Sequence, residues 1–139
     1  MKPNAVTILP DADNIKSVYA RTLKEERVDF ICLSTGYSQV IGEWYDNVYE
    51  PKLFGSSVKT REIVADTAGN RSYGAKKDGV KNQTRYLQDA AESDLIVGDD
   101  FAAIVSFDPD SPYVVVIEDM AIVRSAQAWF DTMWLAAVR

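Results

Sequence analysis

The sequence predicts an α/β fold in which helices flank a mixed β-sheet. Residues 1–92 alternate short apolar runs with segments of helical periodicity, the order expected of strand–helix–strand units. Residues 93–119 hold three short apolar runs separated by Gly-Asp-Asp and Asp-Pro-Asp-Ser-Pro, which favours three consecutive strands in an antiparallel meander. A long amphipathic segment, residues 120–138, follows as the final helix.

The first two strands are expected on either side of a helix. Residues 6–9 form a short strand that a proline ends. A helix covers residues 14–27, with Asp11 or Asp13 as its cap and apolar residues at helical spacing. Residues 28–34 form a second strand, and its apolar run without clean alternation is typical of an interior parallel strand that helices flank.

The middle of the chain is expected to add one helix and two strands. Residues 37–49 have an apolar face at helical spacing, and Pro51 stops or kinks that helix because proline removes a backbone donor. Residues 60–65 form the third strand and residues 84–87 the fourth. Between them, residues 67–78 contain glycines, so any helix there is short and weak.

The meander and the last helix carry the strongest apolar patterns. Residues 114–117 are apolar on both faces, which predicts a central strand covered on both sides. Asp119 caps the helix over residues 120–138. The apolar stripe expected on this helix consists of Ile122, Ala126, Trp129, Phe130, Met133, Trp134 and Ala137.

Length and composition limit the class of protein. A chain of 139 residues, 47% of them hydrophobic, predicts one domain over residues 1–139. Cys32 is the single cysteine, so an intrachain disulfide is excluded and a buried, reduced thiol is expected. Residues 1–4 lead into no signal peptide and no apolar run approaches the roughly 20 residues that span a bilayer, which favours a cytoplasmic protein without membrane contact.

The charge argues against nucleic acid as a partner of this chain. The net charge is −6, whereas phosphate binding needs a basic face. The charge is unevenly placed: residues 59–85 carry a surplus of Lys and Arg, and residues 86–139 are mainly acidic. The basic stretch is interpreted as solvated surface, with an anion-binding or partner-binding band as the alternative.

Several catalytic and metal-binding classes are excluded by missing residues. The chain has no His, which excludes Ser-His-Asp and Cys-His pairs and every His-dependent metal site. No phosphate-binding or dinucleotide-binding glycine motif occurs. Asp99 and Asp100 are interpreted as turn residues rather than metal ligands, because Asp favours tight turns on its own. We therefore expect no metal and no cofactor.

The order of elements after residue 92 resembles a known family. A strand, a Gly-Asp turn, a strand ending in Ser106-Phe107, an apolar strand ending in Glu118-Asp119 and an amphipathic helix follow one another. This order is similar to the half-domain of the phospholipase D superfamily. In its enzymes the meander carries a His-x-Lys-x4-Asp motif with His as the nucleophile.

Two registers of that motif are compatible with the acidic turn. One aligns Asp100 with the motif's Asp and puts Ser93 and Leu95 at the His and Lys positions. The register one residue earlier puts Glu92 and Asp94 there. Neither register supplies His or Lys, so the resemblance implies the fold without the phosphodiesterase chemistry.

A closer resemblance extends over nearly the whole chain. The segments that carry it are residues 14–19, 22–24, 31–35, 61–63, 66–67, 84–87, 96–99, 103–107 and 116–119. They are similar to the C-terminal domain of TrmB-like transcriptional regulators, which has a degenerate phospholipase D-like fold. Members of that family usually begin with a winged-helix DNA-binding domain, and we expect no such domain in this chain. The resemblance implies a non-catalytic domain for small-ligand sensing and dimerisation, either the sensor part of such a regulator or a stand-alone relative. Two alternatives stay open: an interaction module without ligand, and a hydrolase that uses carboxylates such as Glu92 and Asp94.

The ligand implied by the resemblance is a small effector, a sugar or an anion, near the degenerate active-site cleft. Such ligands bind at the carboxyl ends of parallel strands, and Tyr37 or Trp44 offers an aromatic platform. In the alternative reading, Ser34 and Thr35 only end a strand and Arg85 only pairs with a nearby carboxylate, that of Asp66 or of Glu62. The candidate ligand-binding residues are Ser34, Thr35, Arg61, Asp66, Arg71, Arg85, Glu92 and Ser93.

The last helix also predicts self-association. Trp129, Phe130, Met133 and Trp134 lie close together, more aromatic area than one helix face usually needs. An isologous homodimer is the commonest way to cover such a surface. The alternative is a monomer in which all four side chains pack into their own sheet.

Overall fold

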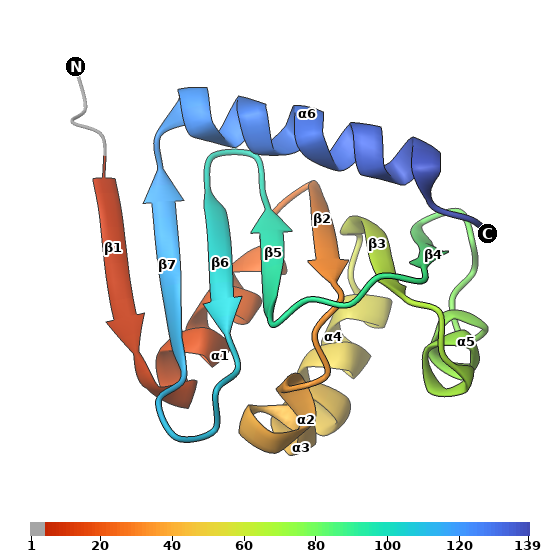
Figure 1. Ribbon diagram of the computed structural model, residues 1–139, viewed down its shortest axis with the longest axis horizontal. Coiled ribbons are helices and arrows are strands. Elements are labelled where there is room, and N and C mark those ends of the chain that lie inside the picture. Colours follow the sequence, from red (N-terminus) through yellow and green to blue (C-terminus); the bar gives the residue numbers. More distant parts are fainter. Residues whose placement is uncertain (1–4) are drawn as a thin grey trace.

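The computed structural model describes residues 5–139 and contains one seven-stranded sheet (Figure 1). The strand order is β1-β7-β6-β5-β2-β3-β4. The expectation about a signal peptide concerns residues 1–4 and lies outside the described part of the chain. The strands are β1 (Ala5–Pro10), β2 (Arg27–Cys32), β3 (Lys59–Ala65), β4 (Asn82–Leu87), β5 (Ser93–Val97), β6 (Ala102–Ser106) and β7 (Tyr113–Glu118).

The sheet is mixed, as the sequence predicts. β2, β3 and β4 run parallel to one another, whereas β5, β6, β7 and β1 form antiparallel pairs. β2 is the junction, because it is parallel to β3 on one side and antiparallel to β5 on the other. The predicted meander is therefore confirmed, and its first strand docks on the interior strand of the parallel half.

Helices cover both faces of the sheet. α1, α2, α3, η1 and α4 lie on one face, and α6 crosses the other (Figure 1). The larger core lies under α1, where Ile15 and Val18 pack on Phe30, Ile96 and Val114. The helical segments are α1 (Asp11–Thr22), α2 (Tyr37–Val40), α3 (Gly42–Trp44), the π-helix η1 (Tyr45–Tyr49), α4 (Glu50–Gly55), α5 (Ala68–Gly74) and α6 (Met120–Ala136).

The first helix begins and ends earlier than the sequence predicts. Its N-cap position is taken by Pro10, which makes no side-chain cap bond, so the prediction of Asp11 or Asp13 as the cap is wrong. The Asp11 N–H instead donates to the carbonyl of Pro112 at 2.9 Å. After Thr22 the backbone tightens into bonds that span three residues, and this turn releases the chain into β2.

The single helix predicted over residues 37–49 is wrong. The chain forms two short α-helical turns, then the π-helical turn η1, and continues through Pro51 to the end of α4. Pro51 is tolerated because it occupies the first turn of α4, where its missing N–H costs no internal bond. The π turn changes the phase of the helix, so Tyr49 is buried while Val48 is exposed.

The last helix has the predicted cap but a different buried face. The Asp119 carboxylate accepts a hydrogen bond from the Ala121 N–H at 3.0 Å. Ile122 and Trp129 are exposed, contrary to the predicted stripe. The side chains of α6 that are buried against the sheet are Val123, Ala126, Phe130 and Trp134. Most of the aromatic area of α6 is thus used within the chain's own core.

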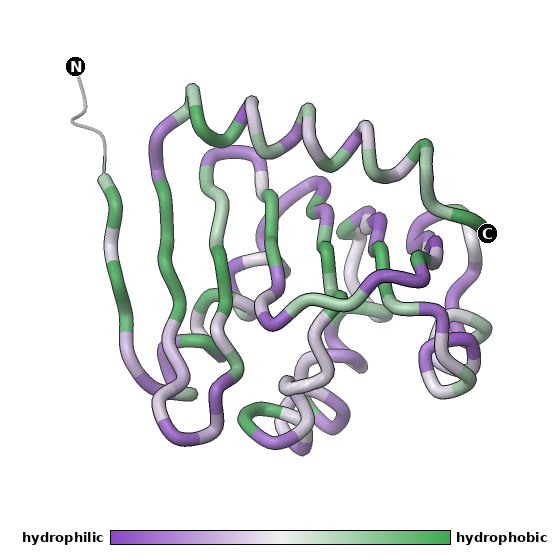
Figure 2. The backbone as a smooth tube through the Cα atoms, viewed as in Figure 1, coloured by the Kyte–Doolittle hydropathy of each residue, from purple (hydrophilic) through white to green (hydrophobic). Residues whose placement is uncertain are grey.

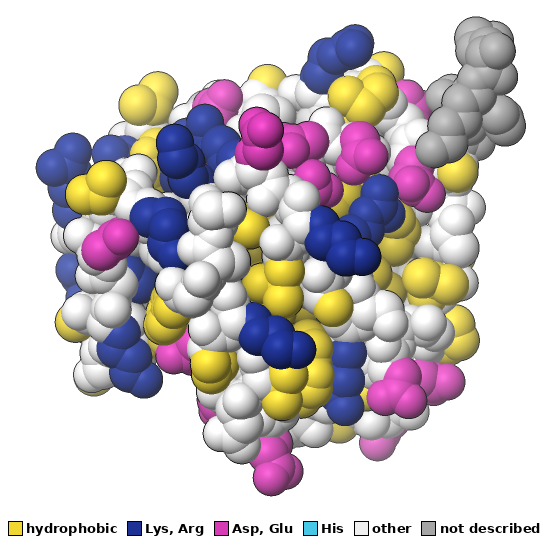
Figure 3. All heavy atoms as spheres, turned by 180° about the vertical axis from the view of Figure 1, so that it is seen from behind, with side chains coloured by type: hydrophobic (Ala, Val, Ile, Leu, Met, Phe, Trp, Pro, Cys, Tyr) yellow, Lys and Arg dark blue, Asp and Glu magenta, His cyan; other side chains and the backbone are white. Residues whose placement is uncertain are grey.

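Charge follows the layout predicted from the sequence. Figure 3 shows Lys and Arg side chains gathered on the side of the molecule that carries β4 and α5. Four cations of the basic stretch, residues 59–85, are paired with carboxylates: Arg61 with Asp29, Arg71 with Asp66, Lys76 with Glu50, and Lys77 with Glu62. Nearby carboxylates therefore neutralise part of the positive charge of residues 59–85.

None of the helices formed by residues 5–139 has the length and apolar character needed to cross a membrane.

The choice of the face of α6 that is buried can be tested by two substitutions. Phe130 is fully buried, so Phe130→Ala should lower the free energy of unfolding by about 3–5 kcal/mol. Trp129 is 64% exposed, and Trp129→Ala should change that free energy by less than about 1 kcal/mol. Urea unfolding of both variants measures the difference. Equal losses would show that the helix is rotated relative to this structure.

Candidate functional site

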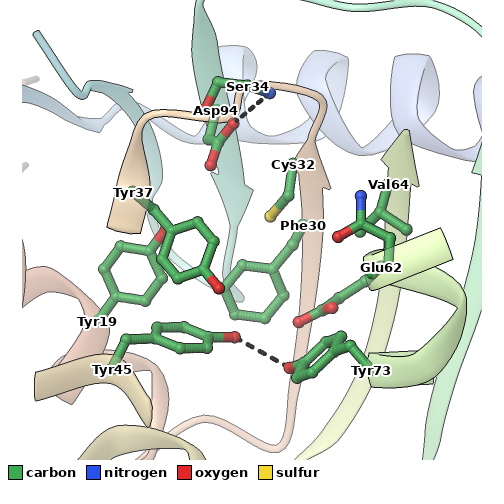
Figure 4. Close-up of a pocket in the computed structure, with 12 residues that line it drawn as sticks. Tyr19, Phe30, Cys32, Ser34, Tyr37, Tyr45, Glu62, Val64, Tyr73 and Asp94 are labelled. Carbon is green, nitrogen blue, oxygen red and sulfur yellow. Dashed lines mark hydrogen bonds between the residues drawn. The ribbon is translucent and has the colours of Figure 1, made fainter. Parts of the chain in front are cut away.

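A cavity of about 250 Å³ opens where the parallel and antiparallel halves of the sheet meet. It lies at the carboxyl ends of β2 and β3, beside the start of β5, on the face covered by α1 (Figure 4). This is the position at which ligands bind in open α/β sheets. The lining residues are Tyr19, Phe30, Cys32, Ser34, Tyr37, Tyr45, Glu62, Val64, Gly69, Asn70, Tyr73 and Asp94.

Aromatic rings from five different elements form most of the wall. Tyr19 stacks near Phe30 with ring centroids 6.2 Å apart, and Tyr37 meets Tyr45 edge to face at 5.3 Å. The hydroxyl groups of Tyr45 and Tyr73 are hydrogen-bonded at 3.0 Å (Figure 4). The η1 turn therefore serves the site, because it carries Tyr45 into the cavity wall.

Two glycines allow the chain to close around the cavity. A Cβ on Gly36 would lie 2.8 Å from the Cβ of Phe107, so only glycine lets the loop after β2 pass there and carry Tyr37 to the site. The same holds at the end of α5, where a Cβ on Gly74 would collide with the hydroxyl of Tyr86. This close approach holds α5, and with it Tyr73, against the edge of the sheet.

Asp94 is the one carboxylate of the cavity wall that has no cationic partner. The residue is 3% exposed, and its Oδ1 accepts a hydrogen bond from the Ser34 N–H at 3.2 Å. The other carboxylate oxygen has no hydrogen bond to a described residue and points into the cavity (Figure 4). Burial raises the pKa of Asp94 to about 6, and the hydrogen bonding with Ser34 opposes that rise.

Glu62, on the opposite side of the cavity, is neutralised. Lys77 Nζ lies 2.7 Å from Glu62 Oε2 and 2.7 Å from Thr84 Oγ1. Both partners are almost completely buried, with side chains 1% and 4% exposed. The lining of the cavity itself contains neither Lys nor Arg.

The groups in the wall suit binding better than nucleophilic catalysis. Burial raises the pKa of the Cys32 thiol, and it raises the pKa of the hydroxyls of Tyr19 and Tyr45 in the same way. These groups are therefore protonated and weakly nucleophilic at neutral pH. The Ser34 hydroxyl is buried without a hydrogen-bond partner among the described residues, which leaves it available to a ligand.

Of the predicted site residues, the cavity takes in Ser34 and the platform residue Tyr37. Thr35 is exposed beyond the end of β2, and Trp44 packs on the core instead of lining the cavity. Glu92 and Ser93 are exposed, while their neighbour Asp94, considered only for the hydrolase alternative, faces inward.

The three predicted arginines lie away from the cavity. Arg61 points to the α6 face, where it forms a bidentate pair with the buried Asp29 and bonds Asp131. Arg85 lies on the same face and donates to the Trp134 carbonyl at 2.6 Å, so its suggested pairing with Asp66 or Glu62 is wrong. Side chains alternate along a strand, and this alternation sends Arg61 and Glu62 to opposite faces.

Asp66 and Arg71 form a surface pair outside the cavity. Arg71 Nε lies 2.8 Å from Asp66 Oδ1, and the guanidinium stacks 3.7 Å from the centroid of the Tyr86 ring. Sequence reasoning missed Tyr19, Tyr45 and Tyr73, because tyrosines in apolar stripes indicate core. Thr60, Glu62 and Val64 are two residues apart along β3 and therefore share one face. This alternation could have indicated which side chains of β3 face the cavity.

Comparison of the sequence with protein-family models and with curated proteins gives no match. Among solved structures, NucT from Helicobacter pylori matches with a TM-score of 0.67 at 13% identity, over 98% of both chains. Nuc from Salmonella typhimurium, a phospholipase D family member, matches with a TM-score of 0.62 at 12% identity, over 97% of both chains. The chain has a phospholipase D-like fold.

The TrmB-like resemblance is also found at the level of the fold. TrmBL2, described as an archaeal chromatin protein with a novel mode of DNA binding, matches with a TM-score of 0.64 at 18% identity. The match covers 96% of this chain and 53% of TrmBL2, so the chain spans about half the length of that relative.

The unpaired charge of Asp94 predicts a pH-dependent cost to stability. Its folded pKa of about 6 is raised above the ordinary 3.8, so its contribution to stability is complete below pH 4 and is lost as the pH rises through 6. Asp94→Asn should therefore raise the free energy of unfolding by up to roughly 3 kcal/mol at pH 7.5. Urea unfolding of both proteins between pH 4 and pH 8 measures this. A variant less stable than the native chain at pH 7.5 would contradict the assignment.

Proposed function

We propose that the chain is a non-catalytic domain that senses a small ligand and dimerises, as implied by its resemblance to TrmB-like regulators. The observation that carries the proposal is the cavity of about 250 Å³ at the junction of β2, β3 and β5. It has aromatic rings in its wall and two polar atoms without a hydrogen-bond partner of good geometry among residues 5–139, the Ser34 hydroxyl and one oxygen of Asp94. Mostly apolar cavities with a few unsatisfied polar groups are the usual form of small-molecule sites.

The non-catalytic part of the proposal rests on the groups available in the cavity. The chain has no His to act as the nucleophile of phospholipase D chemistry. Of the two motif registers, the one that uses Glu92 and Asp94 brings its Lys position to the cavity, and an aspartate stands there. In the other register the Lys position is Leu95, which packs under α6. DNA binding is likewise not proposed for this chain, because its net charge is −6.

The absence of phosphodiesterase activity is testable with a generic phosphodiester substrate. We expect no turnover above that of buffer, with a phospholipase D enzyme as the positive control. Turnover that disappears in Asp94→Asn or in Glu92→Gln would support a hydrolase instead and overturn this part of the proposal.

Ligand sensing is tested by blocking the cavity. A Cβ on Gly69, at the cavity rim, has no atom within 4 Å, so Gly69→Phe adds a ring there without backbone strain. A panel of sugars, organic acids and organic amines is screened for a rise in melting temperature. A ligand at a hundredfold excess over its Kd should stabilise the native chain by about 2.7 kcal/mol. Gly69→Phe should abolish that gain.

Two controls locate the binding. Gly55 at the end of α4 also has open space around it and does not line the cavity, so Gly55→Phe should retain binding. Cys32 is the single cysteine and lines the cavity, so a bound ligand should slow its modification by a small thiol reagent. If no compound class raises the melting temperature of the native chain, the sensing proposal fails.

The dimerisation part of the proposal rests on an apolar area of the sheet that α6 leaves uncovered. We call it the open sheet face, and it is continuous with the face under α6 because Ile8, Val115, Ile104 and Leu95 are paired in one row across four strands. Figure 2 shows these strands as largely hydrophobic. The exposed members of the open sheet face are Val6 at 63%, Ile8 at 68%, Ile104 at 41% and Tyr113 at 41%.

A second copy of the chain is the proposed occupant of the open sheet face. Sedimentation at micromolar concentration should give about twice the chain mass of 15.5 kDa. Ile8→Lys should shift the chain to a monomer, because it places a charge in the centre of the buried contact. Leu135 is 83% exposed on α6, so Leu135→Lys should leave the dimer intact. A monomeric native chain would contradict the proposal.

A further inference from the structure

The charges around the cavity point to a class of ligand. We propose that the cavity binds a small organic cation, an alkylammonium ion, with Asp94 as its counter-ion. This inference rests on the proposed function, because it takes the cavity to be the ligand site. It differs from the sugar or anion that the family resemblance implies.

The charged groups in the cavity wall are two carboxylates, and only one of them is paired with a cation. Glu62 is paired with Lys77 at 2.7 Å. Asp94 forms no salt bridge with any described residue, and the donors beside it are neutral: the Ser34 N–H at 3.2 Å and the side chains of Ser34 and Cys32. An ionised carboxylate that is 3% exposed is costly to bury without a partner. The cavity therefore holds one uncompensated negative charge.

The aromatic rings of the cavity wall also favour a cation. A cation is attracted to the face of an aromatic ring, more strongly where water is excluded. Tyr19, Phe30 and Tyr37 supply rings to the part of the cavity into which the free oxygen of Asp94 points, and Tyr45 lies at the far end beside Tyr73 (Figure 4). The protein already uses this chemistry next to the cavity, where Lys77 Nζ lies 4.7 Å from the centroid of the Tyr73 ring.

Anions and neutral sugars fit the charges of the cavity less well than an ammonium ion does. An anion would meet Asp94 with no Lys or Arg in the cavity lining to offset the repulsion. A neutral sugar could donate a hydrogen bond to the free oxygen of Asp94 and to the Ser34 hydroxyl, but it would leave the buried charge uncompensated. An ammonium group supplies both the donors and the charge.

Three probes of similar size and different charge test the proposal: cyclohexylammonium, cyclohexanol and cyclohexanecarboxylate. Calorimetric titration at pH 7.5 should show cyclohexylammonium binding at least about tenfold more tightly than cyclohexanol, with no binding of the carboxylate. Cyclohexylammonium should also slow the modification of Cys32. Equal affinity for the alcohol, or tighter binding of the carboxylate, overturns the proposal.

Two matched substitutions assign the effect to Asp94. Asp94→Asn keeps the shape and the acceptor for Ser34 but removes the charge, so it should weaken cyclohexylammonium binding at least about tenfold. Asp89 is exposed and outside the cavity, so Asp89→Asn should leave the affinity unchanged. Unchanged binding in Asp94→Asn overturns the proposal.

Failure of the cation proposal can be distinguished from failure of ligand sensing. If glucose or another neutral sugar protects Cys32 and cyclohexylammonium does not, the cation inference is wrong while ligand sensing stands. If no probe of any charge binds in calorimetric titration or raises the melting temperature, both are wrong. Protection by cyclohexylammonium that Gly69→Phe abolishes supports both.

Discussion

The arrangement of this molecule depends on the double pairing of β2. Its backbone bonds to the parallel strand β3 on one side and to the antiparallel strand β5 on the other. The chain leaves β2 and β3 at the same end of the sheet at which it enters β5. Three strand ends thus meet beside one another, and the helical segments that follow β2 and β3 arch over the gap. The cavity is the space that this change of strand direction leaves open.

The same junction holds a buried carboxylate without a cationic partner, that of Asp94. Asp94 is the second residue of β5 and faces the cavity, and the donors beside it, the Ser34 N–H among them, are neutral. Elsewhere the buried carboxylates of the described chain are compensated: Asp29 by Arg61, and Glu62 by Lys77. A site that keeps an unbalanced charge at a cost to stability is typical of binding positions, where selection acts on more than folding.

The sequence was sufficient for the strands, the meander and the capped last helix, because alternation, turn residues and Asp119 are local signals. It was insufficient for the segment after β2, where a π turn changes the helical phase and brings Tyr45 to the cavity. The arginines were misplaced for a related reason. Arg61 and Arg85 lie on β3 and β4 of the parallel half, yet strand alternation directs their side chains to the face opposite the cavity, and the sequence alone does not show which face that is.

The π turn also makes residues 45–49 the place in this helical segment where the chain length can change at least cost. A π turn is an α-helical turn that has absorbed one extra residue, so removing a residue there would restore α-helical winding and leave the orientation of the following segment nearly unchanged. Tyr49 and Leu53, both fully enclosed in the core, depend on that orientation, and a deletion within α4 would rotate the residues after it by about 100°. Related chains that keep this cavity should therefore tolerate a one-residue deletion in η1 better than one in α4.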